Sequence, residues 1–77
     1  MFDARIREHM EVVGSDGDHV GRVDRVRGED IELARLDSGA GLQHHLIPLS
    51  WVARVDRQVH LRLTADQARS LWRKDGH

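Results

Sequence analysis

The sequence predicts a mainly β fold: a small barrel of five to six short strands within residues 8–63, followed by one short C-terminal helix over about residues 65–74. Three observations predict it. Short apolar stretches are separated by turns rich in glycine and aspartate. The stretch 59–63 alternates between apolar and polar residues, as a half-buried strand does. Thr64 and Gln67 have the spacing of a helix capping box. With 77 residues, the chain is expected to form one domain.

The N-terminal part is expected to be a lead-in followed by a hairpin. Phe2, Ile6 and Met10 recur every four residues, which fits either one helical turn or an irregular segment. A first strand is expected from Glu8 to Val13. The pair Asp16-Gly17 then supplies the positive φ that a tight hairpin turn needs.

The second strand is expected from His19 to Arg27. Its valines are three residues apart, so one straight strand cannot place all of them on one face. Gly21 therefore indicates a bulge or a bend. After a turn over residues 28–30, Ile31 and Leu33 alternate with their neighbours as in a half-buried strand.

The central stretch holds the only proline of the chain, Pro48, followed by Trp51. A loop over residues 37–41 precedes a strand from about Leu42 to Ile47, which Pro48 ends because it has no N–H for the ladder. We expect this strand to form an exposed edge of the sheet. The chain then turns, and a strand over residues 52–55 leads into the next hairpin.

The C-terminal helix is expected to cover the barrel. Thr64 caps its first turn with Gln67, as proposed above, and Ala68, Leu71 and Trp72 fall on one helical face. We expect all three to face the core. The last three residues are expected to form a fraying tail.

Two motifs resemble those of the PRC-barrel fold. Residues 16–23, Asp-Gly-Asp-His-Val-Gly-Arg-Val, match its opening DG-x-x-[VI]-G-x-V, and residues 47–52, Ile-Pro-Leu-Ser-Trp-Val, match its corner [VI]-P-x-x-x-[VI]. The whole chain is similar to a group of small stand-alone bacterial domains of unknown function with this barrel. The resemblance implies the fold and the character of a binding module, and it leaves the partner open.

Composition excludes several classes of protein. Cysteine is absent, so neither a disulfide framework nor a thiolate metal site is expected. The formal net charge of −1 gives no overall attraction to nucleic acid or to an anionic membrane. No apolar run approaches the roughly 18 residues of a membrane span, and the first residues do not form a signal peptide. We therefore expect a soluble cytoplasmic protein.

Histidines are the candidates for a metal or pH-sensing site. The chain holds six, and the candidate metal ligands are His44, His45 and His60, with His9 or His19 as an additional ligand. Because His44 and His45 are adjacent on a strand, their rings point to opposite faces and cannot chelate one ion. We expect no bound metal or other cofactor. A pH-sensitive structural role for the inward ring of the pair is kept as an alternative hypothesis.

No catalytic constellation follows from the spacing of the nucleophilic residues. The serines fall in turns or on the helix, and the paired carboxylates also occupy turns, where aspartate is favoured for local hydrogen bonds. The prediction is that the protein is not an enzyme.

The function predicted from the sequence is protein binding or self-association, including a homodimer, through a small β domain. An RNA- or ribosome-associated role is the alternative, since arginines recur at residues 22–27 and 54–62, although acids accompany each group. The residues predicted to take part in an interaction are two tryptophans, two histidines and an arginine: Trp51, Trp72, His44, His45 and Arg54.

Overall fold

The fold was analysed in a computed structural model that describes residues 5–34 and 44–75. The elements in chain order are β1 (Glu11–Val13), β2 (His19–Arg27), β3 (Asp30–Leu33), β4 (His44–Pro48), the 3-10 turn η1 (Leu49–Trp51), β5 (Val52–Val55), β6 (Gln58–Leu61), α1 (Ala65–Leu71) and β7 (Arg73–Asp75). The mainly β class with one short C-terminal helix is confirmed. The predicted loop over residues 37–41 lies outside the described residues.

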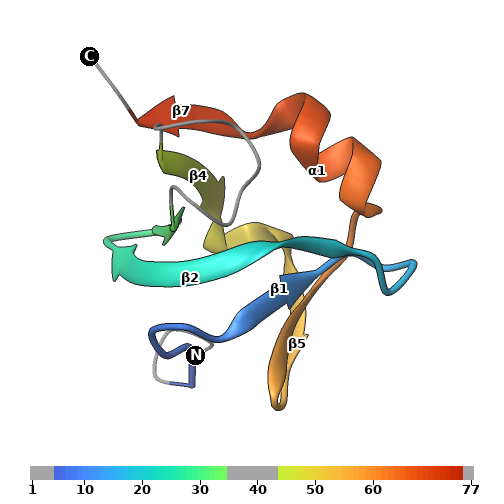
Figure 1. The fold of residues 1–77 in the computed structure, drawn as a ribbon, viewed down its shortest axis with the longest axis horizontal. Coiled ribbons are helices and arrows are strands. Elements are labelled where there is room, and N and C mark those ends of the chain that lie inside the picture. Colours follow the sequence, from blue (N-terminus) through green and yellow to red (C-terminus); the bar gives the residue numbers. More distant parts are fainter. Residues whose placement is uncertain (1–4, 35–43, 76–77) are drawn as a thin grey trace.

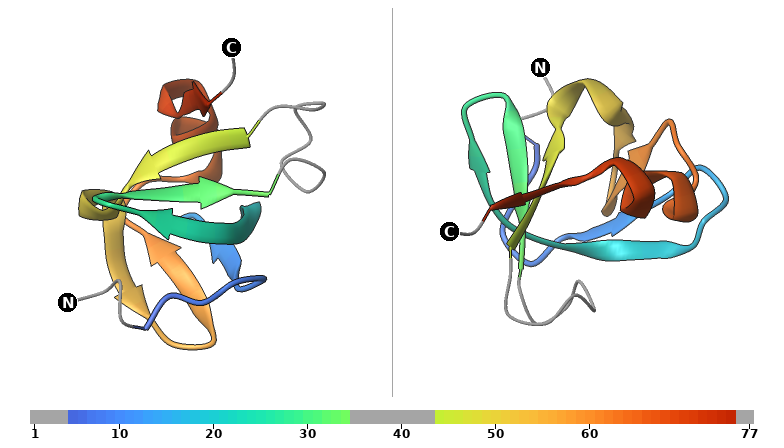
Figure 2. Two further views of the ribbon diagram at one scale, coloured as in Figure 1. Left: turned by 90° about the vertical axis from the view of Figure 1, so that its left-hand side faces the viewer. Right: turned by 90° about the horizontal axis from the view of Figure 1, so that it is seen from above.

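The strands form one curled, mixed sheet in the order β5-β6-β1-β2-β3-β4-β7 (Figure 1). All neighbours are antiparallel except β1 and β6, which run parallel. The α1 helix and β7 lie on one side of the molecule and the β5–β6 hairpin on the opposite side (Figure 2). Within the described residues the row ends at β5 and β7, so the sheet is open rather than a closed barrel.

The core lies inside the curl of the sheet and is aliphatic. Ile6 joins it from the lead-in segment, and the half-buried Trp51 and Trp72 pack against it. The lead-in is irregular from Arg5 to Met10, and β1 begins at Glu11 rather than at Glu8. Its fully buried side chains include those of Val12, Val20, Val23, Ile31, Leu33, Ile47, Val52, Val59 and Leu61.

The irregular valine spacing of β2 is explained by two shifts in register. Val12 pairs with Gly21 and Val13 with His19, so the intervening Val20 has no opposite residue. A second shift, next to Asp24, occurs against β3. Each extra residue moves the following side chains to the other face. The bulge predicted at Gly21 is thus confirmed, one residue away, and β2 can place its valines in the core.

The prediction that the strand before Pro48 is an exposed edge was wrong. β4 pairs with β3 on one side and with β7 on the other. Pro48 lies at the end of the strand, where its missing N–H does little harm to the ladder. The partner that covers the edge, β7, could not be expected because its residues carry the pattern of a helix end.

The predicted helix of residues 65–74 is shorter than expected. α1 ends at Leu71, and residues 73–75 form β7 instead of continuing the helix or fraying. Leu71 is 61% exposed rather than turned to the core, whereas Ala68 is fully buried. The backbone becomes extended at Trp72, which allows the indole to pack against the core. Among the described helices, none is long and apolar enough to cross a membrane.

Candidate functional site

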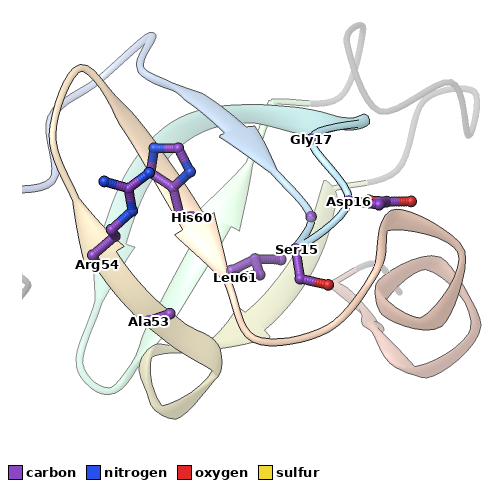
Figure 3. Close-up of a pocket in the computed structure, with 8 residues that line it drawn as sticks. Ser15, Asp16, Gly17, Ala53, Arg54, His60 and Leu61 are labelled. Carbon is purple, nitrogen blue, oxygen red and sulfur yellow. The ribbon is translucent and has the colours of Figure 1, made fainter.

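A hollow of about 470 Å³ opens on the outer side of the β5–β6 hairpin (Figure 3). One wall is the loop between β1 and β2, and the other is the start of β5 at Ala53 and Arg54. His60 and Leu61 of β6 lie between the two walls. The lining therefore combines glycine backbone and apolar carbon with two basic side chains. Its residues are Gly14, Ser15, Asp16, Gly17, Ala53, Arg54, His60 and Leu61.

The loop wall is held against the start of α1. The N–H of Ser15 donates to the carbonyl of Leu63 at 2.7 Å, and the N–H of Gly17 donates to the carbonyl of Gly14 at 3.0 Å. Gly14 is buried, and a Cβ placed on it would lie only 2.3 Å from the backbone nitrogen of Ala65. Only glycine permits this close approach. The loop is thus fixed in position relative to the hairpin.

The opposite wall carries a small charged cluster. Arg54 and His60 are cross-strand partners in the hairpin, so both side chains lie on the same face. The Nε2 of His60 lies 2.9 Å from Asp56 Oδ1, and Arg54 Nη1 lies 3.4 Å from Asp56 Oδ2. The backbone N–H of Gln58 and the ring of His60, both bonded to this carboxylate, lower the pKa of Asp56. Asp56 therefore holds both basic groups from the turn beside the hollow.

The one acidic residue of the lining is directed elsewhere. Asp16 Oδ1 accepts the backbone N–H of Ala65 at 3.3 Å and that of Asp18 at 3.4 Å. In Figure 3 its carboxyl group points toward the helix and away from His60 and Arg54. The hollow therefore presents the basic groups of Arg54 and His60 on one wall, and no carboxylate of its lining faces them from the opposite wall.

Ser15 and His60 line the hollow and Asp56 lies beside it, which raises the question of a Ser-His-Asp triad. A triad needs the serine hydroxyl within hydrogen-bond reach of the imidazole. Figure 3 shows the Ser15 hydroxyl directed away from His60, on the far wall of the hollow. The arrangement therefore has a histidine paired with a carboxylate but no nucleophile placed against it.

A second histidine–carboxylate pair lies farther along the same face of the sheet. His19 Nδ1 is 2.8 Å from Glu11 Oε2, and Gln58 Nε2 donates to Glu11 Oε1 at 2.6 Å. The hydrogen bond from His19, followed by that from Gln58, lowers the pKa of Glu11. Val13 lies between His19 and His60 in the register of the strands. The two histidine–carboxylate pairs therefore lie on the same outer face of β1, β2 and β6, with the buried Val13 between them.

The inward histidine of the predicted pair, His45, belongs to the packed interior of the protein. His45 is 1% exposed, and its ring stacks on Trp72 with centroids 4.0 Å apart and an interplanar angle of 22°. Trp51, the other tryptophan, packs on the core from η1. His60 belongs to the hollow instead, and the His44 side chain lies outside the described part. Within the described residues, no group of three or more potential ligands could hold a metal ion.

Two arginines of the predicted arginine face, Arg25 and Arg27, form ion pairs with a single carboxylate. Arg25 Nε lies 2.7 Å from Glu32 Oε1, and Arg27 approaches the other oxygen at 3.8 Å. Glu32, expected on the exposed side of a half-buried strand, is buried to 4% side-chain exposure beneath these arginines. Arg73 of β7 pairs with Asp30 across β4 at 2.5 Å. These contacts join β2, β3 and β7.

A comparison with models of protein families identifies the family of this chain. Residues 6–69 match the model of a family described as "Uncharacterized protein conserved in bacteria (DUF2171)". The chain belongs to this family. The match covers β1 through β6 and most of α1, and so includes every residue that lines the hollow. No curated protein and no solved structure gives a significant match. Membership in DUF2171 supports the bacterial domain of unknown function expected from the sequence.

Of the residues predicted to interact, the hollow contains Arg54 alone. It adds His60, which had been considered only for metal binding, and the loop residues from Gly14 to Gly17, which had been interpreted as turn chemistry. The loop and the hairpin are brought together by the parallel pairing of β1 with β6, for which no short-range pattern exists. The alternation of residues 59–63 did, however, already place His60 on the outer face.

Proposed function

We propose that this member of DUF2171 is a non-enzymatic binding domain, and that it takes up an extended segment of a partner protein along the edge of β5 that pairs with no other strand of the described residues. The observation that carries the proposal is the position of the hollow directly beside an edge strand, with Ala53 and Arg54 belonging to both. Added strands gain affinity from main-chain hydrogen bonds and specificity from side-chain pockets at alternate positions. The β5 edge and the hollow offer both features together.

The binding partner is proposed to be another protein rather than a second copy of this chain. β5 carries an irregular register at Ala53 and an exposed charge at Arg54, two features that protect sheet edges from pairing with themselves. In a two-fold antiparallel pair of β5 strands, the two Arg54 side chains would lie close together and repel each other. A different protein can bring complementary groups to the same edge.

A binding role is favoured over catalysis and over RNA binding. The hydroxyl of Ser15 is turned away from His60, so the hollow lacks a positioned nucleophile. Arg25 and Arg27 hold the buried Glu32, and both described tryptophans pack on the core, which leaves them poorly placed to stack on bases. Location in the cytoplasm remains part of the proposal, because the chain has no cysteine.

We also propose a relationship to the PRC-barrel fold. Three features within the two matching motifs support this proposal: the positive φ of Gly17 in the first turn, the bulge beside Gly21, and the turn after Pro48 that precedes β5. The open row of strands departs from a closed barrel, and the α1 helix and β7 cover one of its sides.

The proposal is tested by selecting peptides from a random linear library displayed on phage, with the 77-residue protein as bait. Selected peptides are then added to ¹⁵N-labelled protein. We expect the largest amide shifts at β5 and at the lining of the hollow. The variant V55P removes the Val55 N–H, which faces away from β6, and should weaken binding, whereas V55T should bind like the wild type. Thermal unfolding checks that both variants are folded.

Two results would overturn the proposal. One is the failure of the library to yield any specific peptide under conditions that work for a control peptide-binding domain. The other is a set of peptides whose shifts lie elsewhere, for example around Arg25 and Arg27, with unchanged affinity for V55P. In that second case, RNA oligonucleotides at low ionic strength become the next probe.

A further inference from the structure

We propose that the hollow recognises an acidic side chain of the bound segment, with Arg54 as the group that binds its carboxylate and His60 as a second donor when protonated. This inference rests on the proposed function, because it assumes a segment lying along β5. It adds the chemical class of the residue that enters the hollow.

The basic side of the hollow is built by the hairpin itself. Arg54 and His60 are cross-strand neighbours, and Figure 3 shows their side chains next to each other on one wall. The planar guanidinium offers paired donors that match a carboxylate, and a protonated imidazole donates from both nitrogens. A strand added beside β5 would direct alternate side chains toward this face.

The acids near the hollow are placed so that they do not block this role. The Asp16 carboxylate accepts hydrogen bonds from the backbone of Ala65 and Asp18, which directs it toward α1. Asp56 contacts the two basic groups from the hairpin turn and is not part of the lining. The remaining surface is apolar at Leu61 and Ala53, which suits the methylene groups of a glutamate or aspartate.

Asp56 acts in this arrangement as an internal competitor of the ligand. Its contact with Arg54 is 3.4 Å long and exposed on both sides, with side-chain exposures of 68% and 49%. Such a pair is weak, so the guanidinium can turn to an incoming carboxylate at little cost. Removal of the Asp56 charge should therefore strengthen binding of an acidic peptide. Asparagine at this position retains the oxygen that accepts the Gln58 N–H in the turn.

The test uses the peptides selected above, each made in an acidic form and in the matching amide form, Asp→Asn or Glu→Gln. We expect the acid to be enriched at one position and the amide form to bind about tenfold more weakly or worse. R54Q should lose affinity for the acidic peptide and no longer distinguish the two forms. D56N should bind the acidic peptide more tightly than the wild type. R57Q, which removes an exposed arginine from the same hairpin, is the matched control and should change little.

The outcomes separate this inference from the proposed function. If peptides bind at β5 but the acid and amide forms have equal affinity, or if R57Q weakens binding as much as R54Q, the acidic-residue inference is wrong and the binding edge stands. If no peptide binds, or the shifts lie away from β5, both fall. Because Arg54 is exposed, R54Q is expected to fold normally, and its ¹⁵N spectrum verifies this.

Discussion

At the scale of single residues, the most constrained positions are glycines at close approaches. A methyl group on Gly14 would meet the backbone of Thr64 and Ala65, which cannot move without shifting the start of α1. At Gly21, by contrast, the nearest atom is the Cδ1 of Leu33 at 3.3 Å, the end of a flexible side chain. The two buried glycines therefore differ in what surrounds them.

This difference gives a prediction for two alanine variants. We expect G14A to lose about 3 kcal/mol of unfolding free energy, at the upper end of overpacking costs, and G21A to lose about 1 kcal/mol. Urea denaturation followed by tryptophan fluorescence measures both. Equal losses in the two variants would contradict the assignment of Gly14 as the contact that fixes the loop.

The Glu11 pair with His19 gives a prediction of pH dependence. Hydrogen bonds from His19 and Gln58 lower the folded-state pKa of Glu11 below its ordinary value of 4.5. A depressed carboxyl pKa contributes stability that is fully present above the ordinary value and is lost as pH falls through the folded-state value. The stability difference between the wild type and E11Q should thus shrink as pH falls from about 6 to about 3. Urea midpoints across this range measure it. E8Q, which removes one carboxylate from the exposed lead-in, is the control, and the same pH trend in E8Q would refute the role of the pair.

At the scale of elements, the local signals in the sequence predicted most of the structure. The two ends of β2, the extent of β5, the Asp16-Gly17 turn and the Thr64 cap all depend on neighbouring residues, and each was found as expected. The end of α1 was not predicted correctly, because it depends on Trp72, which packs against the core and stacks on His45 of a distant strand. Tertiary contacts of this kind override helix propensity.

The helix cap supplies a prediction at this scale. The Thr64 hydroxyl accepts the Gln67 N–H at 3.2 Å, and the Gln67 side chain accepts the Thr64 N–H at 2.9 Å. We expect T64A to lose about 1 kcal/mol, while T64S retains most of the stability. S70A removes a hydroxyl that donates to the Asp66 carbonyl from an exposed position and should change stability by less than about 0.5 kcal/mol. Thermal and urea unfolding provide the measurement, and a loss in S70A as large as in T64A would argue against the cap.

At the scale of the whole molecule, the candidate site depends on how distant segments pair. The hollow needs the parallel contact of β1 with β6, the hairpin of β5 and β6, and the loop held at the start of α1. The sequence contained the residues but no pattern that joins them, since parallel pairing leaves no turn signal. The buried Glu32 was missed for a related reason: its arginine partners lie across the β2–β3 ladder, beyond a shift in register.

The C-terminal elements α1 and β7 are expected to stabilise the open sheet from one side. α1 and β7 cover one side of the curl, and Trp72 joins them to the core through its stack on His45 and its contact with the core cluster. Since the indole is half-buried, we expect W72A to lose about 2–3 kcal/mol, somewhat less than a fully buried tryptophan would. The neighbouring L71A removes a side chain that is 61% exposed and should lose less than about 0.5 kcal/mol. Hydrogen exchange of W72A should show reduced protection first in α1, β7 and β4, while β1 and β2 remain protected. Uniform loss of protection over all strands would instead mean that the C-terminal cover and the sheet unfold as one unit.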